Sequence, residues 1–185
     1  MWTALSQFEG QFLLWVQEVF RQPWLSPVVA FYTELGNRGL VWIALCLLML
    51  LWPKTRRAGW AGIFALVLSL LCTNVILKHL FTRPRPWLVL EGLIPLVAER
   101  DPNSFPSGHS SAAFSCAAAW WRYLPRPWRI TAAVCALLMA LSRLYVGVHF
   151  PIDVACGILV GLFCGWGGWR LEEEKGKRKG RQAAC

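Results

Sequence analysis

The chain has 185 residues, of which 56% are hydrophobic and only 16% are charged, and its formal net charge is +9. A water-soluble domain of this length carries more charge and interrupts its apolar runs sooner, so the composition favours a single membrane-embedded domain. The net charge alone would suit a nucleic-acid binder, but 12 Trp and 10 Phe are typical of aromatic anchors at membrane interfaces, so we expect no nucleic-acid partner.

The first 22 residues lack the basic start and continuous apolar core of a cleavable signal peptide. They instead repeat apolar side chains at helical spacing, among several glutamines. This pattern predicts either an amphipathic helix lying in the membrane interface or a helix packed against the bundle. The apolar residues are Leu5, Phe8, Phe12, Val16 and Val19.

Five apolar runs follow, and a bilayer core takes about 20 helical residues. The sequence therefore predicts an all-α membrane bundle of about five transmembrane helices within 39–169, as a single domain. Residues 28–36 extend the first run outward. Six of the seven cysteines lie inside apolar runs without CxxC spacing, so we expect small buried hydrophobes, with no disulfide or metal site. The runs are 39–52, 59–77, 110–124, 128–147 and 152–169.

The distribution of Lys and Arg predicts the orientation. Twelve of the 19 basic residues lie in the loops that follow the first, third and fifth runs, and the other seven lie on the opposite side. The positive-inside rule places the twelve in the cytoplasm, so the N-terminal segment lies outside and the basic tail, residues 172–185, lies inside. We expect this tail to be a solvated anchor against anionic lipid.

Two stretches on the minority side carry chemical groups. Residues 78–86 place Lys78 at a helix end and Arg85 between two prolines, which stiffen the chain. Residues 105–111 form a turn that runs into an apolar helix, where Gly108 permits close backbone approach and the helix start offers N–H groups to an anion. We expect Arg83, which precedes Arg85, to be peripheral.

A third stretch, residues 142–153, contains Arg143, His149 and Asp153. Pro151 suits the first turn of the last helix, which leaves Asp153 one turn from His149. A charge at the end of a membrane span is often only an interfacial anchor. Here, however, all the chemical groups of this side would meet at one depth.

Phosphate is the ligand that this set of groups would bind. Arg85 and Arg143 can grip it bidentately, Lys78 adds a point charge, and the turn of Ser107 and Gly108 adds N–H donors. These five are the predicted phosphate-binding residues.

The two histidines would divide the chemistry between them. A neutral His149, hydrogen-bonded to Asp153 through one ring nitrogen, exposes the other nitrogen as a nucleophile, and a protonated His109 can give a proton to the departing oxygen. The catalytic set is therefore His149, His109 and Asp153. Metal ligation by the same three residues is the rival use, but neighbouring cations would repel a divalent ion, so no metal or other cofactor is expected.

These residues resemble the three signatures of the type 2 phosphatidic acid phosphatase superfamily, KxxxxxxRP, PSGH and SRxxxxxHxxxD. The resemblance covers about residues 24–170. It implies a phosphohistidine at His149, protonation of the leaving group by His109, orientation of His149 by Asp153, and no metal. The matched positions are Lys78, Arg85-Pro86, Pro106 to His109, Ser142-Arg143, His149 and Asp153.

The resemblance implies a membrane lipid phosphatase whose partners are a lipid phosphate and the surrounding lipid, in a bacterial plasma membrane with an extracytoplasmic active site. Undecaprenyl diphosphate is the favoured substrate, and phosphatidylglycerol phosphate or phosphatidic acid is the alternative. A lipid transporter or scramblase would need the cations but not the pair of His149 and Asp153. A vanadate haloperoxidase and a purely structural bundle are further alternatives, and the oligomeric state stays open.

Overall fold

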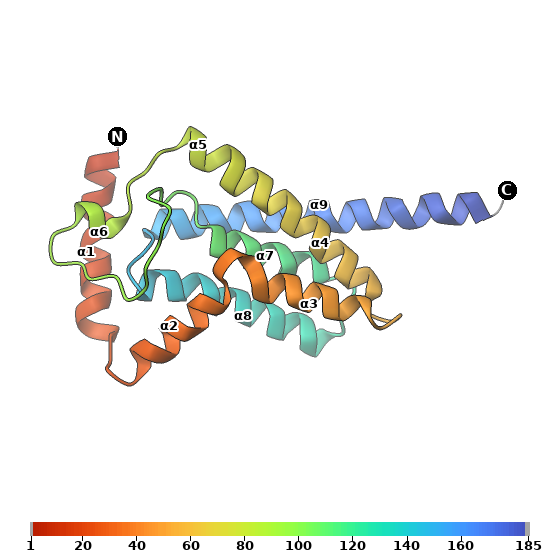
Figure 1. The fold of residues 1–185 in the computed structure, drawn as a ribbon, viewed down its shortest axis with the longest axis horizontal. Coiled ribbons are helices and arrows are strands. Elements are labelled where there is room, and N and C mark those ends of the chain that lie inside the picture. The colour runs from red at the N-terminus through yellow and green to blue at the C-terminus, as the bar shows by residue number, and fades with distance from the viewer. Residues whose placement is uncertain (1, 184–185) are drawn as a thin grey trace.

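The computed structural model describes residues 2–183, which form an elongated bundle of helices (Figure 1). Within this part of the chain the only β-type pairing is an isolated bridge between Pro84 and Asn103, and no strand forms. The predicted all-α class is therefore confirmed.

Three helices are long and apolar enough to cross a membrane, and a bent pair of helices would make a fourth. The bent pair is α2 and α3, which meet at 47° around the short helix η1. Residues 28–36 thus stay a predicted outward extension of the first run, and the structure adds a bend between the two. The three long spans are Arg56–Leu80, Arg126–Tyr145 and Pro151–Arg178; the elements of the bent pair are α2 (Leu25–Leu35), η1 (Asn37–Gly39) and α3 (Leu40–Leu50).

The remaining elements complete this arrangement. The first long span is continuous through α4 (Arg56–Leu70), a π-helical segment η2 (Leu71–Leu77) and α5 (Lys78–Leu80). The third predicted run corresponds to α7, which has only 13 residues, so the count of five spans stays a prediction. The others are α1 (Trp2–Phe20), α6 (Pro86–Val89), α7 (Gly108–Trp120), α8 (Arg126–Tyr145) and α9 (Pro151–Ala183).

The helices α7 and α9 pack closely because glycines recur every fourth residue along α9. A Cβ atom at Gly161 would lie 2.6 Å from the carbonyl oxygen of Ser111, and Gly157 and Gly165 face α7 in the same way. Small residues at such spacing let helix backbones approach in a membrane. This contact fixes the start of α9 against the start of α7.

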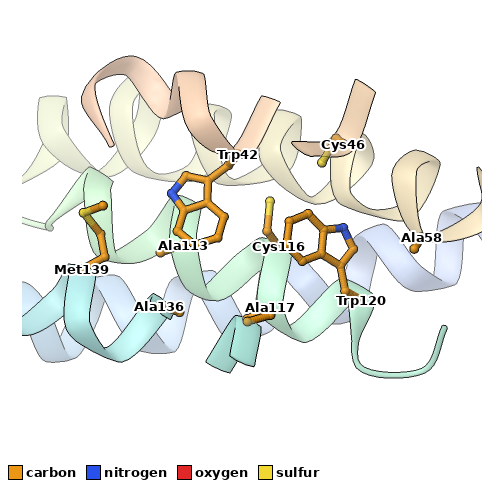
Figure 2. Packing of buried hydrophobic residues seen from close by; sticks show 10 residues of the cluster. Trp42, Cys46, Ala58, Ala113, Cys116, Ala117, Trp120, Ala136 and Met139 are labelled. Carbon is orange, nitrogen blue, oxygen red and sulfur yellow. The ribbon is translucent and has the colours of Figure 1, made fainter. Parts of the chain in front are cut away.

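The main apolar core lies among α3, α4, α7 and α8 (Figure 2). Its largest members are Trp42 and Trp120, whose ring centroids lie 6.1 Å apart, and small residues fill the remaining space. Cys46 and Cys116 belong to this core, and the six cysteines of the described chain are all unpaired. Cys185 lies outside the described residues.

Helix α1 crosses the end of the bundle (Figure 1). Leu13 and Val16 are buried against the protein, whereas Phe8, Trp15 and Val19 are exposed. The helix thus packs on the bundle with one face and presents apolar residues outward with the other.

The first residue of the predicted basic tail, Glu172, is not solvated. Helix α9 continues to Ala183, and Glu172 is buried within it. The Glu172 carboxylate accepts hydrogen bonds from Arg57 Nε and Nη2, each over 3.0 Å, and one from Tyr123 Oη over 2.5 Å. Residues 172–185 were expected to be solvated, which is wrong for Glu172. Residues 184 and 185 lie outside the described chain.

Candidate active site

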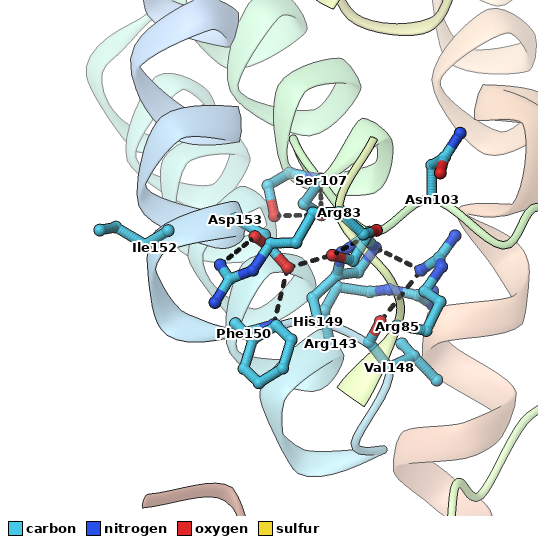
Figure 3. A network of polar contacts seen from close by, with 12 residues as sticks. Arg83, Arg85, Asn103, Ser107, Arg143, Val148, His149, Phe150, Ile152 and Asp153 are labelled. Atoms are coloured by element: carbon cyan, nitrogen blue, oxygen red, sulfur yellow. Dashed lines mark hydrogen bonds and ion pairs between the residues drawn. The ribbon is translucent and has the colours of Figure 1, made fainter. Parts of the chain in front are cut away.

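Two loops and the first turn of α9 meet at the end of the bundle that α1 crosses. The chain after α5 runs alongside residues 103–104, where the Ser104 amide donates a hydrogen bond to the Arg83 carbonyl over 2.8 Å. The Ser107 amide in turn donates to the Asp153 carbonyl over 2.9 Å. These backbone bonds hold all three sequence stretches of interest together (Figure 3).

The three predicted phosphate-binding cations gather here, and two carboxylates of the loop before α7 form ion pairs with them. Lys78 Nζ donates to Asp101 Oδ2 over 2.5 Å. Glu99 pairs with Arg143 through one oxygen and lies 3.6 Å from Arg85 Nη2 through the other. Both arginine side chains are buried. The cluster can therefore hold an anionic group shared between several cations.

Arg85 is the centre of this cluster. Its Nη1 donates to His149 Nε2 over 3.0 Å and to the Val148 carbonyl over 3.0 Å, and its Nε donates to the Asp101 carbonyl over 3.0 Å. Arg143 is held from its other side by Thr33, which accepts from Nη1 over 2.7 Å. Each guanidinium is thus fixed in orientation before any ligand arrives.

His149 is buried in the loop between α8 and α9. Because arginine can only donate, its hydrogen bond with Nε2 requires that this nitrogen accept, so a neutral ring carries its proton on Nδ1. Burial, followed by the positive charges of Arg85, Arg143 and Lys78, holds the pKa of His149 well below its ordinary value. The ring is therefore neutral at physiological pH, with the Nε2 lone pair directed toward the cations.

Asp153 lies behind this ring without forming the predicted hydrogen bond. Its Oδ2 is 3.8 Å from His149 Nδ1 and accepts instead from the Phe150 amide over 2.9 Å. Its Oδ1 accepts from Arg83 Nη1 over 2.7 Å. The carboxylate still faces the imidazole, but its two closest partners are other groups.

Arg83 corrects a second expectation. It was predicted to be peripheral, yet its side chain is fully buried and bonded to Asp153. A second carboxylate, Glu9 of α1, accepts from Arg83 Nη2 over 2.5 Å. The prediction was wrong because the two carboxylates that bind Arg83 lie on α1 and α9, far from it in the sequence.

The turn before α7 contributes less to an anion site than expected. Ser107 Oγ accepts from the amide and the hydroxyl of Ser110, over 3.4 Å and 3.0 Å, so this side chain caps α7. Since the Ser107 amide donates to Asp153, the first-turn N–H groups of Gly108 and His109 are the ones that the helix itself leaves available. The phosphate-binding role of Ser107 and Gly108 stays a prediction.

His109 stands in the first turn of α7, near His149 and close enough to Arg143, Arg85 and Lys78 for their charges to act on it. Its Nε2 lies 3.0 Å from Asn37 Oδ1, in the bend between α2 and α3. The two histidines therefore share one cluster with the three cations.

Sequence reasoning missed two kinds of residue. Glu99 and Asp101 were not among the predicted site residues, because a loop without a periodic pattern does not indicate which charges its acids will meet. Glu9 was overlooked, although it lies four residues before Leu13 and seven before Val16, on the same buried face of α1. An acid within an apolar helical face is the signal that could have found it.

Within residues 2–183, no group of three or more His, Cys, Asp or Glu side chains is arranged to hold a metal ion. The titratable groups near His149 are instead paired with arginines or a lysine.

Comparison with known proteins gives consistent matches. Residues 58–177 match the sequence profile of the PAP2 superfamily. The chain is 30% identical over 137 residues to an undecaprenyl-diphosphatase of Sulfolobus acidocaldarius, covering 74% of this chain and 66% of that protein. It is 33% identical over 159 residues to phosphatidylglycerophosphatase B of Bacillus subtilis, covering 78% of this chain and 73% of the relative.

Two crystal structures share the fold. Aquifex aeolicus LpxE superposes with a TM-score of 0.76 at 28% identity, over 86% of this chain and 93% of that one. The transmembrane PAP2-type phosphatidylglycerolphosphate phosphatase of Bacillus subtilis superposes with a TM-score of 0.74 at 30% identity, over 93% and 88%.

Proposed function

The chain belongs to the PAP2 superfamily, and from this premise we propose that it is a membrane lipid phosphatase acting through a covalent phosphohistidine. The observation that carries the proposal is the 3.0 Å hydrogen bond from Arg85 Nη1 to His149 Nε2. It puts the unprotonated nitrogen of a neutral imidazole at the edge of a cluster of three cations. A phosphate that binds the cations and takes over the Arg85 Nη1 hydrogen bond would free this lone pair for attack on phosphorus.

In the first step, His149 Nε2 attacks phosphorus and forms a P–N bond while the bond from phosphorus to the lipid oxygen breaks. His109 gives its proton to the departing oxygen. Lys78, Arg85 and Arg143 stabilise the charge on the three equatorial oxygens, which is worth about 3 kcal/mol for each well-placed donor.

In the second step, water attacks the phosphohistidine and His109 takes up the proton. The P–N bond breaks, inorganic phosphate leaves, and His149 returns to its neutral form. Asp153 stabilises the positive charge that its ring carries during each step, as a carboxylate behind an imidazole does elsewhere. The reaction needs no redox step.

The favoured substrate is a polyprenyl diphosphate of the undecaprenyl type, which would be converted to the monophosphate and inorganic phosphate. The similarity to an undecaprenyl-diphosphatase supports this choice. Phosphatidylglycerol phosphate is a second candidate, because a phosphatidylglycerophosphatase is similar in sequence and a phosphatase of that type is similar in fold. Phosphatidic acid would fit the same cation cluster.

We infer a bacterial plasma-membrane location with the active site on the extracytoplasmic face and the end of α9 in the cytoplasm. The basic residues at the far end of the bundle from His149 support this orientation through the positive-inside rule. The bent pair α2 and α3, the short α7 and the three long spans would together make five crossings of one domain, with α1 in the outer interface.

The decisive experiment assays purified protein in detergent against a panel of undecaprenyl diphosphate, phosphatidylglycerol phosphate and phosphatidic acid, with His149→Ala as the control. Phosphate release by the native chain and none by the variant is expected. A lipid transporter or scramblase would move lipid without releasing phosphate, and its transport would survive His149→Ala. No release from any phosphorylated lipid would refute the phosphatase.

A further inference from the structure

Helix α1 places one acidic side chain deep inside the protein. The Glu9 side chain is 6% exposed, and the arginine and aspartate with which it forms a chain of charges, Arg83 and Asp153, are both 0% exposed. Buried charges are costly unless they are paired and hydrogen-bonded. Arg83 therefore forms ion pairs with both Glu9 and Asp153, and these pairs compensate for the burial of all three charges.

The two oxygens of Glu9 make different contacts. Oε2 accepts from Arg83 Nη2 over 2.5 Å, and Oε1 accepts from the amide of Ile152 over 2.7 Å. The Ile152 amide lies in the first turn of α9, where N–H groups have no partner within the helix and a negative charge is favourable. Glu9 thus fixes both Arg83 and the turn that carries Asp153.

Arg83 in turn fixes the carboxylate of Asp153. Arg83 Nη1 donates a hydrogen bond to Asp153 Oδ1 over 2.7 Å. The other oxygen of Asp153, Oδ2, then faces Nδ1 of His149 at 3.8 Å. The guanidinium also stacks on the ring of Phe150 at 3.9 Å, and Ser6 of α1 accepts from its Nη2 over 3.1 Å. The Arg83 guanidinium is thus held among residues of α1 and the start of α9.

We propose that α1 is part of the catalytic apparatus, with Glu9 and Arg83 acting as positioning residues that orient Asp153 behind His149. This inference rests on the proposed phosphohistidine function. It assigns the N-terminal helix a role beyond anchoring, because a charge on α1 determines the geometry of a group more than 140 positions later in the chain.

The test compares Glu9→Gln and Arg83→Lys in the full chain with Glu18→Gln, which changes an exposed carboxylate on the same helix. Loss of one hydrogen bond to a charged group corresponds to about 10–100-fold in a rate or equilibrium constant. We expect Glu9→Gln and Arg83→Lys to lower kcat by that amount with KM changed by less than about 3-fold, and Glu18→Gln to behave as wild type. A rise in KM alone, or equal behaviour of Glu9→Gln and Glu18→Gln, would overturn the proposal.

A double-mutant cycle separates positioning from general damage. If Glu9 acts through Asp153, adding Glu9→Gln to Asp153→Asn should cause little further loss, since coupled residues are non-additive. Losses that multiply in the double variant would mean an independent, structural role. Thermal unfolding of each variant identifies any that has simply failed to fold, and the nearly isosteric Glu9→Gln then carries the test alone.

A measurement that does not depend on catalytic turnover tests this inference separately from the proposed function. Histidine NMR titration follows the pKa of His149, whose signal is identified by its loss in His149→Gln. Removing the negative charge in Glu9→Gln leaves Arg83 less compensated and should lower that pKa, whereas Arg83→Met should raise it. Shifts of one sign, or none, would overturn the positioning role; absence of phosphate release by wild type would refute only the phosphatase.

Discussion

The Nη1 group of Arg85 donates a hydrogen bond to Nε2 of His149 over 3.0 Å, so the same arginine that would bind phosphate also determines which imidazole nitrogen is unprotonated. An arginine in this position favours the neutral ring twice, through the hydrogen bond that Nε2 must accept and through its positive charge. The nucleophile is therefore prepared in the absence of substrate.

This relationship predicts the acid limb of the pH profile. The pKa of His149 is lowered by burial first and by the charges of Arg85, Arg143 and Lys78 second. Because the reaction needs the neutral ring, kcat/KM should fall only as the pH drops through this lowered pKa, below the value of about 6.5 for an ordinary histidine. Arg85→Gln removes a positive charge and should move the limb to higher pH, even though it also weakens binding. A limb at or above pH 6.5 in wild type would contradict the assignment.

Removal of either histidine should abolish turnover. His149→Ala eliminates the nucleophile and His109→Ala eliminates the proton donor, and losses of about 10⁴-fold or more are typical for such groups. The measurement is phosphate release by protein whose thermal unfolding matches wild type. His79→Ala is the control, because His79 is exposed at the end of the first long span, and this substitution should leave the rate unchanged.

The site residues could be predicted where local spacing defines them. Arg143, His149 and Asp153 lie within a single stretch of twelve residues, and the turn at Gly108 opens a helix, so sequence alone indicated how these groups would be presented. The long spans could be predicted for the same reason, since an apolar run is a local property.

Contacts between distant residues could not be predicted in this way. Glu9 and Arg83 are 74 positions apart, and the loop carrying Glu99 has no periodic pattern from which its partners could be inferred. In place of the hydrogen bond expected between Asp153 and His149, Asp153 Oδ2 accepts from the Phe150 amide and Oδ1 accepts from Arg83, which had been assigned to the periphery. The bend at η1 depends on the positive φ of Arg38, 55°, which apolar spacing does not indicate.

Close packing of α7 on α9 should make Gly161 intolerant of even one added methyl group. In Gly161→Ala the new Cβ would lie 2.6 Å from the Ser111 carbonyl oxygen and 2.9 Å from Phe114 Cβ, so the helices must separate. Overpacking of this kind costs about 1–3 kcal/mol. Thermal unfolding in detergent measures the loss. Gly176→Ala on the same helix is the matched control, since its nearest neighbour would be 4.0 Å away, and it should not destabilise.

Chelators should leave activity intact, while vanadate should compete with substrate. Three cations around His149 would repel a divalent ion and would instead attract an anion with several oxygens. Vanadate adopts the five-coordinate geometry of phosphorus under attack, so its inhibition should disappear in Arg143→Gln. Inactivation by EDTA that is restored by a divalent metal would contradict this chemistry.

Neutralising Glu99 should strengthen the binding of inorganic phosphate and vanadate. The Glu99 carboxylate pairs with Arg143 and lies 3.6 Å from Arg85, so a phosphate must displace it before both arginines can bind the ligand. In Glu99→Gln this competition is weaker, and we expect the inhibition constants to fall about 10-fold, equivalent to about 1.4 kcal/mol. Glu91→Gln, in the same loop but exposed, is the matched control. Weaker anion binding in Glu99→Gln would mean instead that Glu99 holds the two arginines in place for the ligand, because two guanidinium groups brought together without a carboxylate repel each other.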